Sequence, residues 1–252
     1  METLVPAGLA VHEAGILVVA ALLTSILSAI VGMAGGITLL AVMLLFVEPL
    51  VAIPLHAVVQ IVSNSSRALV HRRAIEWPIL LPYLLPLLPL GWVSLDLAER
   101  LSPSLARTLI GAFVLVATWA PQYLLLGSHP ERSEPHRRFF LLGCMAGVLN
   151  VTVGATGPLI APFFLNLGLS RFALIGTKAA CQTGGHLAKI AVFGWAGFAY
   201  APWAALLSVL CGTVVLGTLL GSRLLGRIDE RGFVILYRAV LTLIALRLVL
   251  GG

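Results

Sequence analysis

Two rows of polar side chains lie at helical spacing inside otherwise apolar stretches. The first row holds His56, Gln60, Asn64 and Arg67, and the second holds Lys178, Gln182, His186 and Lys189. Successive members are three or four residues apart, so each row occupies one face of a helix. Ionisable groups are costly inside a membrane and normally face a cavity or a bundle interior. Because both rows are cationic or neutral and contain no carboxylate, we predict a binding site for a small anion rather than for a metal ion or an amine.

Four of these polar residues also have a structural explanation. Arg67 and Lys189 lie near the ends of their predicted helices, where a long side chain can extend to the lipid headgroups. His56 and His186 can instead hydrogen-bond a neighbouring helix. Lys178 lies about two helical turns inside its span, too deep to reach the interface easily. We therefore predict that Lys178 supplies the countercharge to the anion.

Glycine-rich sequences break two apolar stretches at matching places. The first is Gly-Met-Ala-Gly-Gly at 32–36 and the second is Gly-Ala-Thr-Gly-Pro at 154–158, 122 positions apart (154 − 32). The same offset places each member of the first polar row on a member of the second. A helix that restarts inside the membrane presents free backbone N–H groups, which attract anions.

The breaks add candidate ligands to those predicted from the two rows, which are His56, Gln60, Asn64, Lys178, Gln182 and His186. From the breaks we predict substrate contacts at Gly35, Gly36, Thr156 and Gly157, with Asn150 adding a neutral hydrogen bond just before the second break. Helix packing is the alternative for any single glycine, and bonding to another helix is the alternative for Asn150. The matched positions of the two breaks favour a shared function.

The elements that hold these residues are transmembrane helices. Of all residues, 60% are hydrophobic and 10% are charged, and the mean hydropathy is +1.05, whereas soluble domains carry about 25% charged residues. A spanning helix needs roughly 20 mostly apolar residues. Suitable stretches occur at 15–31, 49–70, 77–95, 105–126, 172–193, 199–220 and 233–250. The chain is therefore predicted to be an all-α polytopic membrane protein.

We predict two inverted repeats, each a glycine-broken helix or helical hairpin followed by three transmembrane helices. The first repeat covers residues 1–126 and the second 139–252, with a polar cytoplasmic linker at 127–138. An odd number of crossings in each half inverts the second. Inversion also gathers most arginines on one side, as the positive-inside rule requires. Those arginines are Arg72, Arg73, Arg132, Arg137, Arg138, Arg171, Arg223, Arg227 and Arg231.

The chain lacks the sequence motifs that mark other functional classes. No P-loop, Gly-x-Ser-x-Gly elbow or His-Glu-x-x-His sequence occurs, so we expect no enzyme, no catalytic residue, no metal and no cofactor. An intramembrane enzyme using Cys181 or His186 and an anion channel of other selectivity are the alternatives. Expected partners are a small anionic substrate and the lipid bilayer, without nucleic acid. A homo-oligomer is left open.

The chain resembles the sulfite exporter TauE/SafE family of membrane permeases. The resemblance lies in the two glycine breaks, in Leu-Ile-Ala-Pro-Phe-Phe-Leu from residue 159, and in Gly-Thr-Lys-Ala-Ala-Cys-Gln-Thr-Gly-Gly-His-Leu-Ala-Lys from residue 176. It spans nearly the whole chain. It implies a secondary transporter of sulfite, organosulfonates or similar sulphur-containing anions in a bacterial inner membrane. The residues themselves indicate only a small anion.

Overall fold

Helices form all the regular structure in the residues described by the computed structural model, which are 9–31, 35–125, 134–164, 167–224 and 230–251. The α-helices are α1 (Val11–Val31), α2 (Gly35–Met43), α3 (Pro49–Val70), α4 (Trp77–Leu84), α5 (Leu87–Arg100), α6 (Pro103–Trp119), α7 (Pro135–Thr152), α8 (Gly157–Phe163), α9 (Arg171–Trp195), α10 (Ala204–Leu224) and α11 (Glu230–Leu250). Short 3₁₀ helices occupy Arg72–Ala74, Pro121–Leu125 and Ala201–Trp203. The all-helical prediction is confirmed for these residues.

The same series of helices occurs twice along the chain. In each half a long helix precedes a short one, and a long polar helix follows. The short helices α2 and α8 begin at Gly35 and Gly157, and the polar helices α3 and α9 begin at Pro49 and Arg171. Both pairs of starting residues are related by the offset that relates the glycine breaks. Helix α7 begins at Pro135, inside the stretch expected to form the linker.

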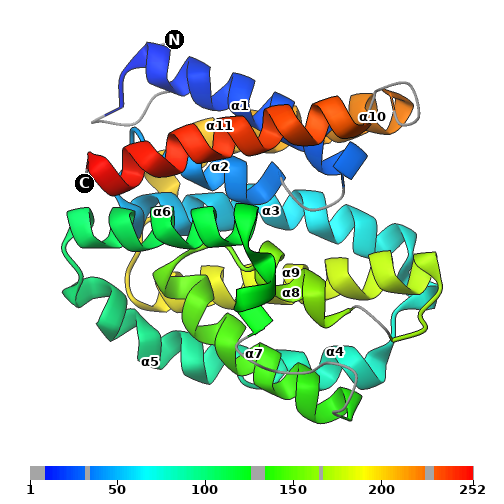
Figure 1. The fold of residues 1–252 in the computed structure, drawn as a ribbon. Coiled ribbons are helices and arrows are strands. Elements are labelled where there is room, and N and C mark those ends of the chain that lie inside the picture. The colour runs from blue at the N-terminus through cyan, green and yellow to red at the C-terminus, as the bar shows by residue number, and fades with distance from the viewer. Residues whose placement is uncertain (1–8, 32–34, 126–133, 165–166, 225–229, 252) are drawn as a thin grey trace.

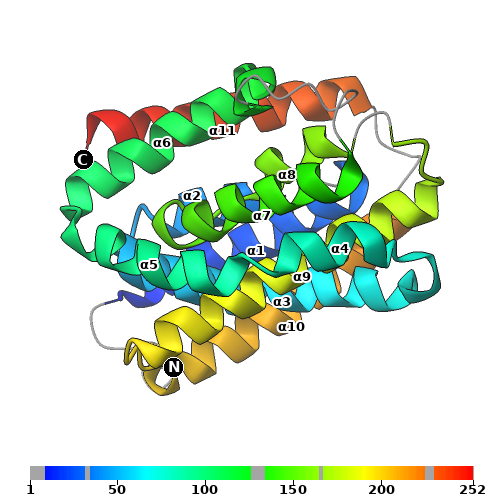
Figure 2. The same ribbon diagram turned by 90° about the horizontal axis from the view of Figure 1, so that it is seen from below.

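The two halves are interlocked rather than side by side. Helix α1 packs on α10 of the other half, and α7 packs on α4 and α5 of the first half. Helix α3 packs on α9, and α6 packs on α11. Figure 1 shows α1, α10 and α11 on one side of the bundle and α4, α5 and α7 on the other, with α3 and α9 between them. Figure 2 shows α6 and α11 lying alongside each other. The two polar helices are therefore central.

Helices α3 and α9 run antiparallel. A Cβ added to Gly176, near the start of α9, would lie 2.9 Å from the Cβ of His71, just after α3. Further along α9, the ring of His186 contacts the ring of His56, which lies early in α3. The Oγ1 of Thr177 also accepts a hydrogen bond of 2.9 Å from the backbone N–H of Glu76. This crossing turns the two polar rows toward each other.

The span predicted at 77–95 is divided into α4 and α5. Helix α4 ends at Leu84 and α5 begins at Leu87, with Pro86 between them. Pro86 has no N–H to continue the ladder, and its ring crowds the preceding turn. Pro82 removes a second donor inside α4. The apolar composition of the stretch predicts a single helix, whereas its prolines divide it.

By length and composition, three helical stretches among the described residues can cross a membrane. They are Val11–Ala29, Trp77–Arg100 and Ala201–Gly221. Large apolar side chains such as Val19, Leu23 and Leu219 are exposed on the surface of the protein. An apolar surface of this kind suits contact with lipid. Together these features fit a multi-pass membrane protein.

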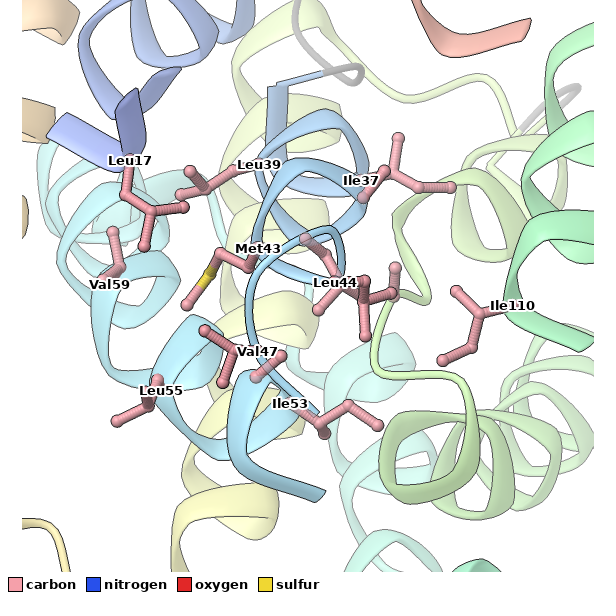
Figure 3. Close-up of a cluster of buried hydrophobic side chains, with 14 of the residues drawn as sticks. Leu17, Ile37, Leu39, Met43, Leu44, Val47, Ile53, Leu55, Val59 and Ile110 are labelled. Atoms are coloured by element: carbon pink, nitrogen blue, oxygen red, sulfur yellow. The ribbon is translucent and has the colours of Figure 1, made fainter. Parts of the chain in front are cut away.

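The short helix α2 is enclosed on several sides by apolar side chains. Leu39, Leu40 and Met43 of α2 are buried, and Leu17 of α1 and Ile110 of α6 belong to the same core. Figure 3 shows side chains from α1, α3 and α6 around α2. Burial on this scale contributes roughly 1.5–3 kcal/mol per large apolar side chain. The core therefore holds the start of α2 in place.

Candidate functional site

A small cavity lies where α2 and α8 begin and α3 and α9 cross. Its free space is about 20 Å³, room for one water-sized group. Its lining combines residues of both breaks and both polar rows. They are Ser28, Gly36, Ile37, His56, Gln60, Asn64, Arg67, Ala155, Thr156, Gly157, Gln182 and His186. The folded chain thus brings residues from both halves to one enclosed point.

At the first break, the two glycines of α2 have different environments. His56 Nε2 lies 2.8 Å from the carbonyl oxygen of Gly36. A Cβ on Gly36 would lie 3.1 Å from Gln60 Oε1, beside the cavity. A Cβ on Gly35 would instead collide with the backbone carbonyl oxygen of Thr24 in α1. Gly35 therefore serves helix packing and does not line the cavity. Positions 32–34 of this break lie outside the described residues.

At the second break, a left-handed glycine turns the chain. Gly154 has φ of +82°, a backbone conformation that glycine adopts without steric cost. Its carbonyl oxygen accepts a hydrogen bond of 2.6 Å from Lys189 Nζ. Helix α8 then begins, with the N–H of Ile160 donating to the carbonyl oxygen of Thr156. Lys189 of α9 thus holds the second break in place. His56 of α3 holds the first break in the same way, through Gly36.

The side chain of Thr156, just before α8, bonds back to α7. Its hydroxyl donates a hydrogen bond of 3.3 Å to Oδ1 of Asn150 at the end of α7. This contact joins the residues on either side of the break. Asn150 Nδ2 is buried and makes no hydrogen bond among the described residues. Asn150 does not line the cavity itself, but its side chain supports Thr156, which does.

The row on α3 is organised by hydrogen bonds within its own helix. The guanidinium of Arg67 donates to Asn64 Oδ1 at 3.0 Å and to Ser63 Oγ at 3.3 Å. Its Nε donates to the carbonyl oxygen of Ser63 at 3.2 Å. Asn64 Nδ2 in turn donates to the carbonyl oxygen of Gln60 at 3.0 Å. Arg67 is thereby held against its own helix, where it lines the cavity.

The row on α9 divides into cavity-lining and supporting residues. Gln182 and His186 line the cavity. Lys189 is fully buried and holds Gly154, so it does not reach the headgroups. Lys178 is 7% exposed but does not line the cavity. Lys178 does interact electrostatically with Arg67. The positive charge that lines the cavity directly is that of Arg67.

Most of the predicted ligands meet in this cavity. Gly35, Asn150 and Lys178 are the predicted ligands that do not line it, and Ser28, Ile37, Arg67 and Ala155 line it in addition. Ser28 is the counterpart of Asn150 at the repeat offset, which is the sequence signal that identifies it. No Asp or Glu lines the cavity, and no group of metal-binding side chains occurs among the described residues. The lining therefore offers amide, imidazole and guanidinium donors, which suit an oxyanion.

Comparison with known protein families gives a match over nearly the whole chain. The family model described as Sulfite exporter TauE/SafE matches residues 17–248, which include both breaks, both polar rows and the cavity. A search of curated proteins gives no match.

Proposed function

The chain belongs to the sulfite exporter TauE/SafE family, and we propose that it is a secondary transporter of small sulphur-containing anions such as sulfite or organosulfonates. Membership of this family implies a membrane transporter of sulphur anions. The observation that carries the finer proposal is the cavity itself. Donor side chains from both halves converge there without a carboxylate.

The lining groups suit the oxygen atoms of such an anion. Gln60 and Gln182 are counterparts at the repeat offset, and both line the cavity. Their amides donate hydrogen bonds from two sides, and Arg67 adds charge-assisted donors. Lys178 adds a second positive charge near Arg67. Because the free space is about 20 Å³, these side chains must move apart to admit an anion, which favours a carrier over an open channel.

Alternating access around this cavity is the mechanism we propose. Helices α3 and α9 cross antiparallel, and the first helix of each half packs on the other half. This exchange of packing partners supports two inverted repeats that rock against each other around a central site. In this arrangement Arg72, Arg73 and Arg223 lie on the cytoplasmic side of a bacterial inner membrane.

Exchange of labelled anion in proteoliposomes tests this function. The purified protein is reconstituted with unlabelled sulfite or a simple organosulfonate inside, and entry of the labelled anion is followed. We expect saturable exchange that Arg67→Gln and Lys178→Ala each reduce strongly. Arg73→Gln is the matched control, because Arg73 is exposed and outside the cavity. Absence of exchange by the well-folded wild-type protein contradicts the proposed function, and full exchange by Lys178→Ala removes that residue from the mechanism.

A further inference from the structure

Two imidazoles in the cavity each have a buried ring nitrogen without a partner. The rings of His56 and His186 meet edge to face, with centroids 5.8 Å apart. The Nδ1 atom of each ring is buried and makes no hydrogen bond among the described residues. Most buried polar atoms in proteins have a partner, so such atoms need an explanation. Here the two atoms belong to a contact between the two halves of the chain.

The hydrogen bond made by His56 determines where this ring can take up a proton. His56 Nε2 lies 2.8 Å from the carbonyl oxygen of Gly36. A carbonyl oxygen only accepts, so Nε2 carries the hydrogen. When the ring is neutral, Nδ1 therefore has a free lone pair. A proton added there makes an imidazolium while the bond that holds the first break stays intact.

Among the described residues, the charged groups that interact with the pair are positive, and the carboxylates Asp96 and Glu99 of α5, which packs on α9, are exposed. Arg67 lies on α3, and Lys178 and Lys189 lie on α9. Lys189 interacts electrostatically with both imidazoles, and Arg67 interacts with that of His186. Helices α2 and α8 contribute no ionisable side chain, and those of α1 are in its first turn.

Tyr83 is the ionisable group that α4 places closest to this part of α9. Its hydroxyl would lie 3.6 Å from a Cβ on Gly185. A phenol is neutral near neutral pH. A positive charge on either imidazole is therefore opposed by its neighbours unless an anion is present in the cavity.

We propose that the His56–His186 pair binds a proton together with the transported anion. This inference rests on the proposed function. An anion in the cavity offsets the repulsion from Lys189 and Arg67, so it favours proton uptake by the pair. Linkage makes the effect reciprocal, and the proton strengthens binding of the anion by the same factor. Anion and proton then cross together, and a proton gradient drives the anion in the same direction as the proton.

The test uses methanesulfonate, a monoanion that does not itself titrate near neutral pH. Proteoliposomes holding the wild-type protein receive a gradient of about one pH unit, with the membrane potential clamped at zero. For one proton per anion, labelled methanesulfonate accumulates about tenfold on the alkaline side, because a tenfold ratio corresponds to 1.4 kcal/mol. A pH-sensitive dye inside the vesicles reports the accompanying proton entry.

The histidine variants locate the coupling. In His56→Gln an amide N–H replaces the donor to Gly36, and we expect the steady-state accumulation ratio to fall to about one. His186→Gln is the second variant. His71→Gln is the matched control, because His71 stacks on Phe172 outside the cavity, and it keeps the accumulation. The ratio is a thermodynamic quantity, so slower transport alone does not change it.

Three results overturn the coupling. They are wild-type exchange without gradient-driven accumulation, accumulation on the acidic side, and full accumulation in both histidine variants. Absence of any sulfonate or sulfite exchange refutes the proposed function instead, and the coupling with it.

Discussion

Gly154→Ala is expected to destabilise the protein through both backbone conformation and packing. The φ of +82° at this position is unfavourable for alanine by about 1–2 kcal/mol. The new Cβ would also lie 2.8 Å from Ile53 Cγ1 and 2.9 Å from Leu40 Cδ2, and overpacking of this kind costs about 1–3 kcal/mol. The free energy of unfolding should therefore fall by about 2–5 kcal/mol in total.

Gly197→Ala separates the two contributions. Gly197 has φ of +91° but no neighbouring atom within 4 Å of an added Cβ. Its substitution should lower the free energy of unfolding by about 1–2 kcal/mol. Both values come from reversible unfolding in mixed micelles with increasing SDS, followed by tryptophan fluorescence. Equal destabilisation by the two substitutions refutes the close packing of the second break against α2 and α3.

Three further substitutions test the packing of the bundle and the wall of the cavity. Gly35→Ala should lower the free energy of unfolding by about 1–3 kcal/mol, because its Cβ meets a backbone carbonyl that cannot rotate away; unchanged stability in the SDS titration contradicts this contact. Gly36→Ala should leave the free energy of unfolding within about 1 kcal/mol of the wild-type value, because Gln60 can rotate away from the added Cβ. The rotation should weaken anion binding about tenfold, because the hydrogen bond from Gln60 to the anion is lost. An unchanged KM for exchange places Gln60 outside the site. Trp119→Phe removes the 2.8 Å hydrogen bond from Trp119 Nε1 to Thr242 Oγ1 and should cost about 0.5–1.5 kcal/mol, whereas stability equal to that of the wild type argues against this link between α6 and α11.

Local patterns in the sequence predicted many of the residues that the structure brings together around the cavity. The spacing of His56, Gln60 and Asn64 places them on one helix face, and the structure directs that face into the cavity. The repeat offset identifies Gln182 as the counterpart of Gln60, and both line the cavity. The family is confirmed by the match over residues 17–248. Periodicity and offset can identify cavity-lining residues because they depend on residues close in sequence or on a duplicated pattern.

Features that depend on three-dimensional packing were not predictable in this way. The position of Lys178 along its helix does not determine where its ammonium group lies. In the structure Arg67 lines the cavity and Lys178 does not. Lys189 holds Gly154, a residue 35 positions away. The bond from Thr156 to Asn150 depends on the path of the chain through the break. The inverted orientation of the repeats stays a prediction.

Direct binding of the anion tests the location of the site. The dissociation constant of labelled sulfite is measured with detergent-purified wild-type protein and with the double variant Gln60→Ala and Gln182→Ala. The matched control is Gln122→Ala, because Gln122 is exposed in the 3₁₀ helix after α6. Two lost hydrogen bonds to an anion should weaken binding by at least about tenfold, while the control binds as the wild type does. Equal affinity in all three proteins contradicts an anion site between α3 and α9.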